Sequence, residues 1–139
     1  ESAELLLQPK KYILGVGCKK GTDSMKLEAF LRKILEEQGF SIEQIAALAS
    51  IDVKKEEACL LEFSEKYRIP FQTYPAQELQ AVPGEFHGSE FVKAQVGVDN
   101  VCERAAMKAA GADGRICRAK QAQDGMTVAI AEKAWKVSV

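Results

Sequence analysis

A glycine-rich stretch at residues 15–23 carries residue types that bind small anions and do nucleophilic chemistry. It contains three glycines, a thiol, two lysines and a threonine, namely Gly15, Gly17, Cys18, Lys19, Lys20, Gly21 and Thr22. An apolar run leads into the stretch and a helical pattern leaves it, which predicts a turn between a buried strand and a helix. Backbone N–H groups at the start of a helix, with lysines beside them, attract carboxylates and phosphates. We therefore predict an anion-binding turn; the alternative is a tight turn whose lysines are only solvated.

Neither of the common nucleotide-binding loops fits this spacing. A P-loop has a lysine between its last glycine and the threonine, whereas Thr22 follows Gly21 directly. The dinucleotide pattern G-x-G-x-x-G is also missed, because the interval between Gly17 and Gly21 is one residue too long. Glu36 and Glu37 stand where a ribose-binding acid is expected, but they fall on a predicted helix. Nucleotide binding is therefore the weaker alternative.

The thiols are expected to be reduced, and one of them is a candidate nucleophile. A helix N-terminus and nearby lysines lower the pKa of a thiol, so Cys18 could do chemistry; the alternative is that it only packs. Cys59, Cys102 and Cys117 fall in helical or strand patterns, where buried thiols are usual. No C-x-x-C pair occurs, and the single histidine, His87, is either exposed or a proton shuttle. We therefore predict no metal site and no resident cofactor.

Polar residues also stand at two later helix starts. Ser50, Asp52 and Lys54 follow the second predicted strand, which places them at the same edge of a parallel sheet as the glycine-rich stretch. Asp52 is expected to cap the next helix, with two glutamates in its first turn. Ser89 and Glu90 begin a later helix, and Glu90 could act as a general base. For each carboxylate, the alternative is that it only complements a helix N-terminus.

The composition narrows the class of protein. The chain has 139 residues, of which 47% are hydrophobic and 28% charged, as in one ordinary globular domain. A formal net charge of -1 argues against a broad basic face for nucleic acid. No apolar run approaches the ~20 residues of a membrane span, and no signal-peptide pattern is present. Together with reduced thiols, this predicts a cytoplasmic protein that binds neither nucleic acid nor membrane.

Apolar periodicity predicts alternating strands and helices. Strands are expected at 12–18, in the second half of 45–51, and at 69–74, 116–121 and 126–132. Gly39 is placed to end the first helix, and Asp124 with Gly125 predicts a hairpin between the last two strands. The predicted fold class is α/β: three layers, α/β/α, around a mixed, mostly parallel sheet with a C-terminal antiparallel hairpin. Residues 1–10 are interpreted as a linker or N-terminal tail and 11–139 as the domain.

Several stretches together resemble the cobalamin-biosynthesis CbiG/CobE family, and most closely the C-terminal domain of CbiG. Residues 15–21 match the family's motif G-[IV]-G-C-[RK]-[RK]-G. The resemblance continues, in order, through residues 49–54, 89–92, 96–106 and 126–131. It therefore covers nearly all of the chain from residue 11 to residue 132.

The resemblance implies a role in corrin-ring assembly. CbiG-type proteins are associated with opening the ring-A lactone of cobalt-precorrin-5A, with loss of acetaldehyde, so a hydrolase domain of a larger protein is expected. The alternative is a non-catalytic precorrin carrier or accessory protein of the CobE type. The implied partners are a cobalt-precorrin or precorrin intermediate and other cobalamin-pathway enzymes, and cobalt is expected only as part of the substrate.

This ligand class agrees with the residues. A precorrin is a flat macrocycle rimmed with carboxylates, so its binding site needs cations and N–H donors at the edge. The predicted substrate-binding residues are those that offer such groups, namely Gly15, Gly17, Cys18, Lys19, Lys20, Gly21, Thr22, Ser50, Lys54 and Ser89. Lactone hydrolysis needs a base and a stabiliser of the oxyanion. We assign these roles, as a hypothesis, to Glu90 or Asp52 and to the N–H groups of the glycine-rich turn.

Overall fold

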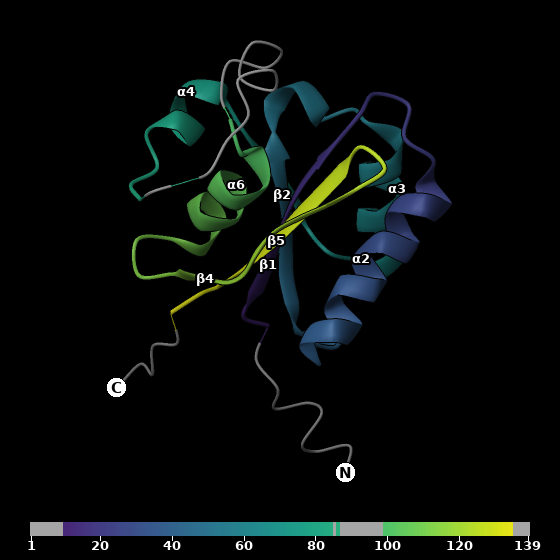
Figure 1. Ribbon diagram of the computed structural model, residues 1–139, viewed down its shortest axis with the longest axis horizontal. Helices are drawn as coiled ribbons and strands as arrows, with labels where there is room; N and C mark the ends of the chain where they lie inside the picture. Colours follow the sequence, from purple (N-terminus) through teal and green to yellow (C-terminus); the bar gives the residue numbers. More distant parts are fainter. Residues whose placement is uncertain (1–9, 85, 87–98, 135–139) are drawn as a thin grey trace.

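The computed structural model describes residues 10–84, 86 and 99–134, and within them five strands form one sheet (Figure 1). The sheet order is β3-β2-β1-β5-β4. The strands are β1 (Tyr12–Cys18), β2 (Ile45–Ile51), β3 (Phe71–Tyr74), β4 (Arg115–Gln123) and β5 (Met126–Glu132). The first three are parallel, whereas β5 is antiparallel to both β1 and β4. The predicted mixed sheet with an antiparallel C-terminal hairpin is confirmed.

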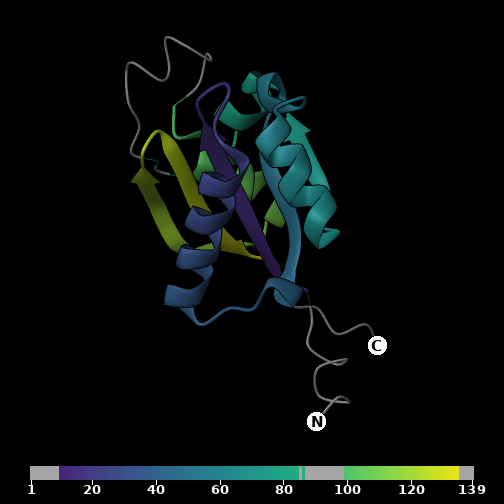
Figure 2. The same ribbon diagram turned by 90° about the vertical axis from the view of Figure 1, so that its right-hand side faces the viewer.

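Helices cover both faces of the sheet, which confirms the three layers (Figures 1 and 2). One face carries α2 (Ser24–Gln38) and α3 (Ala58–Tyr67), and the other carries α4 (Ala76–Gln80) and α6 (Val101–Ala110). In Figure 2, α2 and α3 stand in front of the sheet. Tyr12, Leu14 and Val16 belong to the core under α2 and α3, and Ile13 to the core on the α6 side. A strand covered on both faces is apolar without alternation, as the sequence of β1 is.

Local signals set several element boundaries, and those at Gly39 and at the Asp124–Gly125 hairpin were predicted. Asp23 begins α2, because its carboxylate accepts the N–H of Lys26 at 3.0 Å. Gly39 ends the helix in the left-handed conformation, with φ 74°. Asp124 and Gly125 both have positive φ, 51° and 80°, as the tight hairpin turn between two strands requires.

Asp52 does not cap the second long helix, and this prediction is wrong. Asp52 instead begins a separate 3-10 turn, η2 (Asp52–Lys54), closed by the Lys55 N–H on the Asp52 carbonyl at 3.0 Å. The helix α3 begins only at Ala58, and Glu57 holds the N-cap position. The two glutamates predicted in the first turn therefore precede the helix, because the chain makes this extra turn after β2.

The boundaries of two strands also differ from the prediction. All of the 45–51 run is strand, since the short 3-10 turn η1 (Ile42–Gln44) directly precedes it. The third strand starts at Phe71 rather than at residue 69. The Ile69 N–H is already bonded to the Ser64 carbonyl at the end of α3, at 2.9 Å, and Pro70 has no N–H to donate.

The helix α6 lies unusually close to the middle of β1. A Cβ atom added at Gly15 would stand 1.9 Å from the carbonyl oxygen of Cys102 and 2.8 Å from the Cβ of Ala106. Glycine is therefore required here by the close approach of the helix backbone. Asn100 begins this helix, with its side-chain oxygen accepting the Glu103 N–H at 3.3 Å.

Candidate functional site

The site lies at the carboxyl edge of the parallel strands. Because β1, β2 and β3 run in the same direction, their last residues lie at one edge, and β5 begins there with Met126 opposite Cys18. In an open α/β sheet this edge is where ligands bind. The glycine-rich turn and η2, which follow β1 and β2, are joined at this edge by a hydrogen bond from Gly21 and an ion pair of Lys54, both to Glu57.

The glycine-rich turn has a fixed backbone and exposed lysines. Thr22 closes it twice, through its N–H at 3.2 Å and its hydroxyl at 2.6 Å from the Lys19 carbonyl. Gly21 adopts a left-handed conformation, φ 79°, with no atom near the position of a Cβ. Lys19 and Lys20 are exposed. The aliphatic part of Lys19 lies over the hairpin turn, where a Cβ on Gly125 would come within 2.8 Å of it.

A carboxylate of the protein itself sits against this turn. The Gly21 N–H donates to Oε2 of Glu57 at 2.9 Å, and Lys54 Nζ lies 3.6 Å from Oε1. The side chains of Lys54 and Glu57 are 15% and 11% exposed, so this ion pair is only partly open to water. Sequence reasoning placed Glu57 in a helix and missed this role. The contact joins residues 36 apart, and no local pattern marks it.

Ser50 connects two strands. Its side chain is fully buried, and the hydroxyl donates to the Val16 carbonyl at 2.7 Å, so that it fixes β2 against β1 next to the turn. Thr127 makes a longer contact of the same kind, from its hydroxyl to the Gly17 carbonyl at 3.5 Å. These bonds hold the end of β1 in place. Contact of Ser50 with a ligand stays a prediction.

Cys18 lies against a second thiol. Its Sγ is 3.8 Å from Sγ of Cys59, the second residue of α3. Desolvation is the main cause that raises the pKa of the Cys18 thiol, and it outweighs the opposing hydrogen bond from Cys59 and the charge of Lys54. A thiol with a raised pKa is protonated near neutral pH and is a poor nucleophile. The environment therefore favours the packing alternative for Cys18.

Of the remaining predicted site residues, the structure describes Asp52. Asp52 is half-buried at the start of η2, at the edge just described. Ser89, Glu90 and His87 lie outside the described residues, so whether they face this edge stays open. Within residues 10–84, 86 and 99–134, no three His, Cys, Asp or Glu side chains are grouped to hold a metal ion. No helix in this part of the chain is long and apolar enough to cross a membrane.

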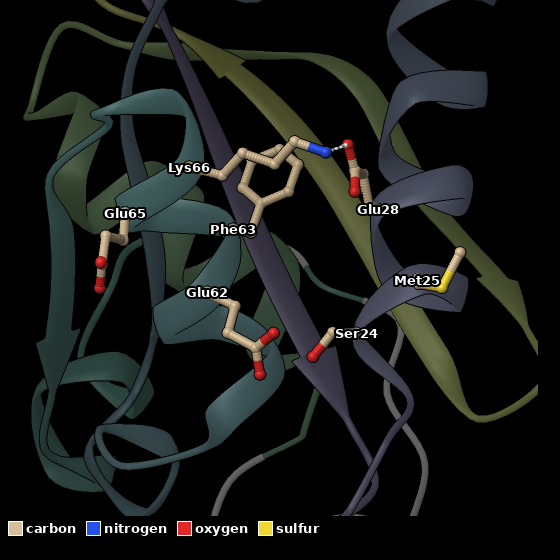
Figure 3. A pocket seen from close by; sticks show the side chains of 7 residues that line it. All are labelled: Ser24, Met25, Glu28, Glu62, Phe63, Glu65 and Lys66. Atoms are coloured by element: carbon tan, nitrogen blue, oxygen red, sulfur yellow. Dashed lines mark hydrogen bonds and ion pairs between the residues drawn. The ribbon is translucent and has the colours of Figure 1, made fainter.

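A hollow of about 440 Å³ lies elsewhere, between α2 and α3 (Figure 3). Three glutamates line it, and Lys66 reaches across to one of them, Glu28, at 2.8 Å. The other lining residues are Ser24, Met25, Glu62, Phe63 and Glu65. An acidic hollow repels carboxylates, so it is unsuited to a carboxylate-rimmed ligand.

The fold and the site together define a three-layer α/β domain whose glycine-rich turn holds the Glu57 carboxylate at the carboxyl edge of its sheet. The family model described as cobalamin synthesis G C-terminus matches residues 12–131. The chain belongs to this family, which associates it with cobalamin biosynthesis, and the family resemblance drawn from the sequence is confirmed.

Individual relatives carry two different names. The chain is 38% identical over 109 residues to the cobalt-precorrin-5A hydrolase of Priestia megaterium, covering 78% of this chain and 29% of that protein. It is 28% identical over 120 residues to protein CobE of a Sinorhizobium species, covering 86% of this chain and 78% of that protein. The crystal structure of CobE from the cobalamin pathway superposes with a TM-score of 0.82 at 28% identity, over 92% of this chain and 94% of that one. The chain thus spans less than a third of the hydrolase but most of CobE.

Proposed function

We propose that this domain binds a cobalt-precorrin or precorrin intermediate at the carboxyl edge of its sheet and recognises the ligand through its carboxylates. The observation that carries the proposal is the carboxylate of Glu57, held by the Gly21 N–H at 2.9 Å and by Lys54 at 3.6 Å. The N–H and ammonium donors that hold this carboxylate are also suited to hold a carboxylate of the ligand. Lys19 and Lys20 are exposed beside it and supply further positive charge.

We further propose that the domain contributes to opening the ring-A lactone when it forms part of a longer protein. The hydrolase relatives that resemble this chain are named for cobalt-precorrin-5A. Asp52, at the same edge, and Glu90 are the candidate bases that would activate water. N–H groups of the glycine-rich turn would stabilise the oxyanion of the tetrahedral intermediate. In this proposal the cobalt belongs to the substrate, the domain holds no cofactor of its own, and the protein acts in the cytoplasm.

A second candidate function is a non-catalytic precorrin carrier of the CobE type. It is favoured by the similarity in structure and sequence, because the CobE crystal structure superposes on this chain with a TM-score of 0.82 and the chain is 28% identical to protein CobE of a Sinorhizobium species. The same carboxylate-binding edge would serve a carrier, without a need for Asp52 or Glu90.

Replacing both Lys19 and Lys20 with alanine should weaken binding of cobalt-precorrin-5A about 10- to 100-fold. Each lost charge-assisted bond to an exposed carboxylate is worth roughly 1 kcal/mol or somewhat more. The melting temperature should stay nearly unchanged, because both side chains are exposed. Binding is measured by absorbance titration of the corrinoid.

The matched control replaces Lys10 and Lys133, which are exposed at the opposite edge of the sheet, and removes the same charge. This variant should bind within about 2-fold of the unaltered protein, since distant exposed charges are screened. Intact binding in the Lys19 and Lys20 variant, or equal loss in both variants, would contradict a carboxylate site at the turn.

Acetaldehyde release separates the two candidate functions. This chain and the full-length Priestia megaterium hydrolase are each incubated with cobalt-precorrin-5A, and acetaldehyde is measured with alcohol dehydrogenase and NADH. Release by both proteins supports a hydrolase domain, and Asp52→Asn should then slow it at least about 100-fold if Asp52 is the base. Release by the longer protein alone contradicts a self-sufficient active site in this chain, and tight binding of cobalt-precorrin-5A by this chain without turnover supports the carrier.

A further inference from the structure

The carboxylate of Glu57 bonds to the glycine-rich turn, although Glu57 begins α3. Glu57 is the N-cap of α3, a position where Ser, Thr, Asp and Asn side chains accept N–H bonds from the first turn of their own helix. Its side chain makes no such cap bond. Only its backbone carbonyl serves the helix, accepting from Leu60 and Leu61 at 3.1 Å each. The carboxylate instead reaches across to a turn that lies 36 residues earlier in the chain.

Both oxygens of this carboxylate meet a donor that would suit a ligand. Oε2 accepts from Gly21, and Oε1 faces Lys54. The two donors come from different elements, the turn after β1 and the short helix η2. Lys54 is 15% exposed, so it is well shielded from water, and its attraction for a carboxylate is stronger than that of a surface lysine. Gly21 is itself exposed, with open space on its Cα side, so a larger carboxylate has room to approach.

We infer that Glu57 is an internal competitor: its carboxylate occupies the subsite where a ligand carboxylate binds, and the ligand displaces it. The inference rests on the proposed function and adds a defined subsite to it, formed by the Gly21 N–H and Lys54. While no ligand is bound, the Glu57 carboxylate provides an acceptor for both the Gly21 N–H and Lys54. It also lowers the apparent affinity for the ligand, because only the fraction of molecules in which Glu57 has left the subsite can bind. Removing the competitor should therefore tighten binding.

The test compares two neutralising substitutions of neighbouring glutamates. Glu57→Gln removes the charge that holds Lys54, whereas Glu56→Gln removes an equal charge from an exposed neighbour. The probe is uroporphyrin, a porphyrin with carboxylates around its rim, and affinity is read from quenching of its fluorescence. Glu57→Gln should bind it about 3- to 10-fold more tightly than the unaltered protein, and Glu56→Gln within about 2-fold. Adding Lys54→Ala to Glu57→Gln should abolish the gain.

A second readout does not depend on tetrapyrrole binding. Sodium propionate is titrated into labelled protein, and the Gly21 amide is followed by NMR. In Glu57→Gln this amide should shift and saturate, and in the unaltered protein it should move much less. Equal affinity for uroporphyrin in the unaltered protein and Glu57→Gln would contradict the competition by Glu57 and leave the proposed function standing. Saturation by propionate without any tetrapyrrole binding would support the carboxylate subsite and contradict the proposed function. No shift of the Gly21 amide in either protein would contradict the carboxylate subsite.

Discussion

Gly15→Ala is expected to destabilise the protein by about 3 kcal/mol or more, enough to leave much of it unfolded. The new Cβ would lie 1.9 Å from the Cys102 carbonyl oxygen and 2.8 Å from the backbone nitrogen of Ala106. Both are atoms of a packed helix, and neither can turn aside as a side chain can. Gly15 lies in the central strand β1 with β2 on one side and β5 on the other, so the strand cannot retreat. Since Gly15 has no positive φ, the cost arises from this contact and not from backbone strain.

The matched control is Gly17→Ala in the same strand. There the nearest atom to the new Cβ is the Thr127 hydroxyl at 2.7 Å, which a rotation of the threonine side chain relieves, so a loss of about 1 kcal/mol is expected. Adding Thr127→Ala should recover most of that loss. Stability is measured by urea unfolding followed by circular dichroism. A Gly15→Ala protein as stable as Gly17→Ala would show that α6 does not lie against β1 as described.

The protein should lose about 3 kcal/mol of stability between neutral pH and pH 10 because two buried thiols must stay protonated. Burial raises the pKa of Cys59 and of Cys102 from 9.0 to about 12. In the unfolded chain both thiols ionise from about pH 9, whereas in the folded protein they do so only near pH 12. Their contribution is therefore fully present below about pH 9 and is lost progressively up to about pH 12. At pH 10 each thiol accounts for about 1 to 2 kcal/mol.

The measurement is urea unfolding at pH 7.5 and pH 10, with a phosphine reductant to keep the thiols reduced. Cys59→Ala and Cys102→Ala should each lower stability at pH 7.5 through lost packing, but each should also remove about half of the alkaline loss. Cys117→Ala is the control: this thiol is only half-buried, and its pKa is raised by less. An alkaline loss of the same size in all three variants would show that other groups cause it.

The parts of the fold that the sequence determined by itself depend on short-range signals. The apolar run of β1, the left-handed Gly39 and the Asp124–Gly125 hairpin are each specified by a few adjacent residues. The order of strands and helices therefore followed from continuous apolar runs and from helical patterns of period three to four. The family could also be identified from the sequence, because its motif is a continuous stretch in which close contact with α6 requires glycine at Gly15 and a positive φ favours glycine at Gly21.

Only the tertiary structure decided how the candidate site is built. Because the chain forms the extra turn η2 after β2, the N-cap of α3 is Glu57 and not the predicted Asp52. Tertiary contacts here override a good cap residue. The Glu57 carboxylate meets Gly21 across 36 residues, and Ser50 meets Val16 across 34. Such contacts depend on which strands become neighbours and in which register, and no local pattern encodes that. Binding of a ligand anion at the turn, expected from its glycines and lysines, stays a prediction, whereas the bond between Gly21 and the Glu57 carboxylate could not be predicted from the sequence.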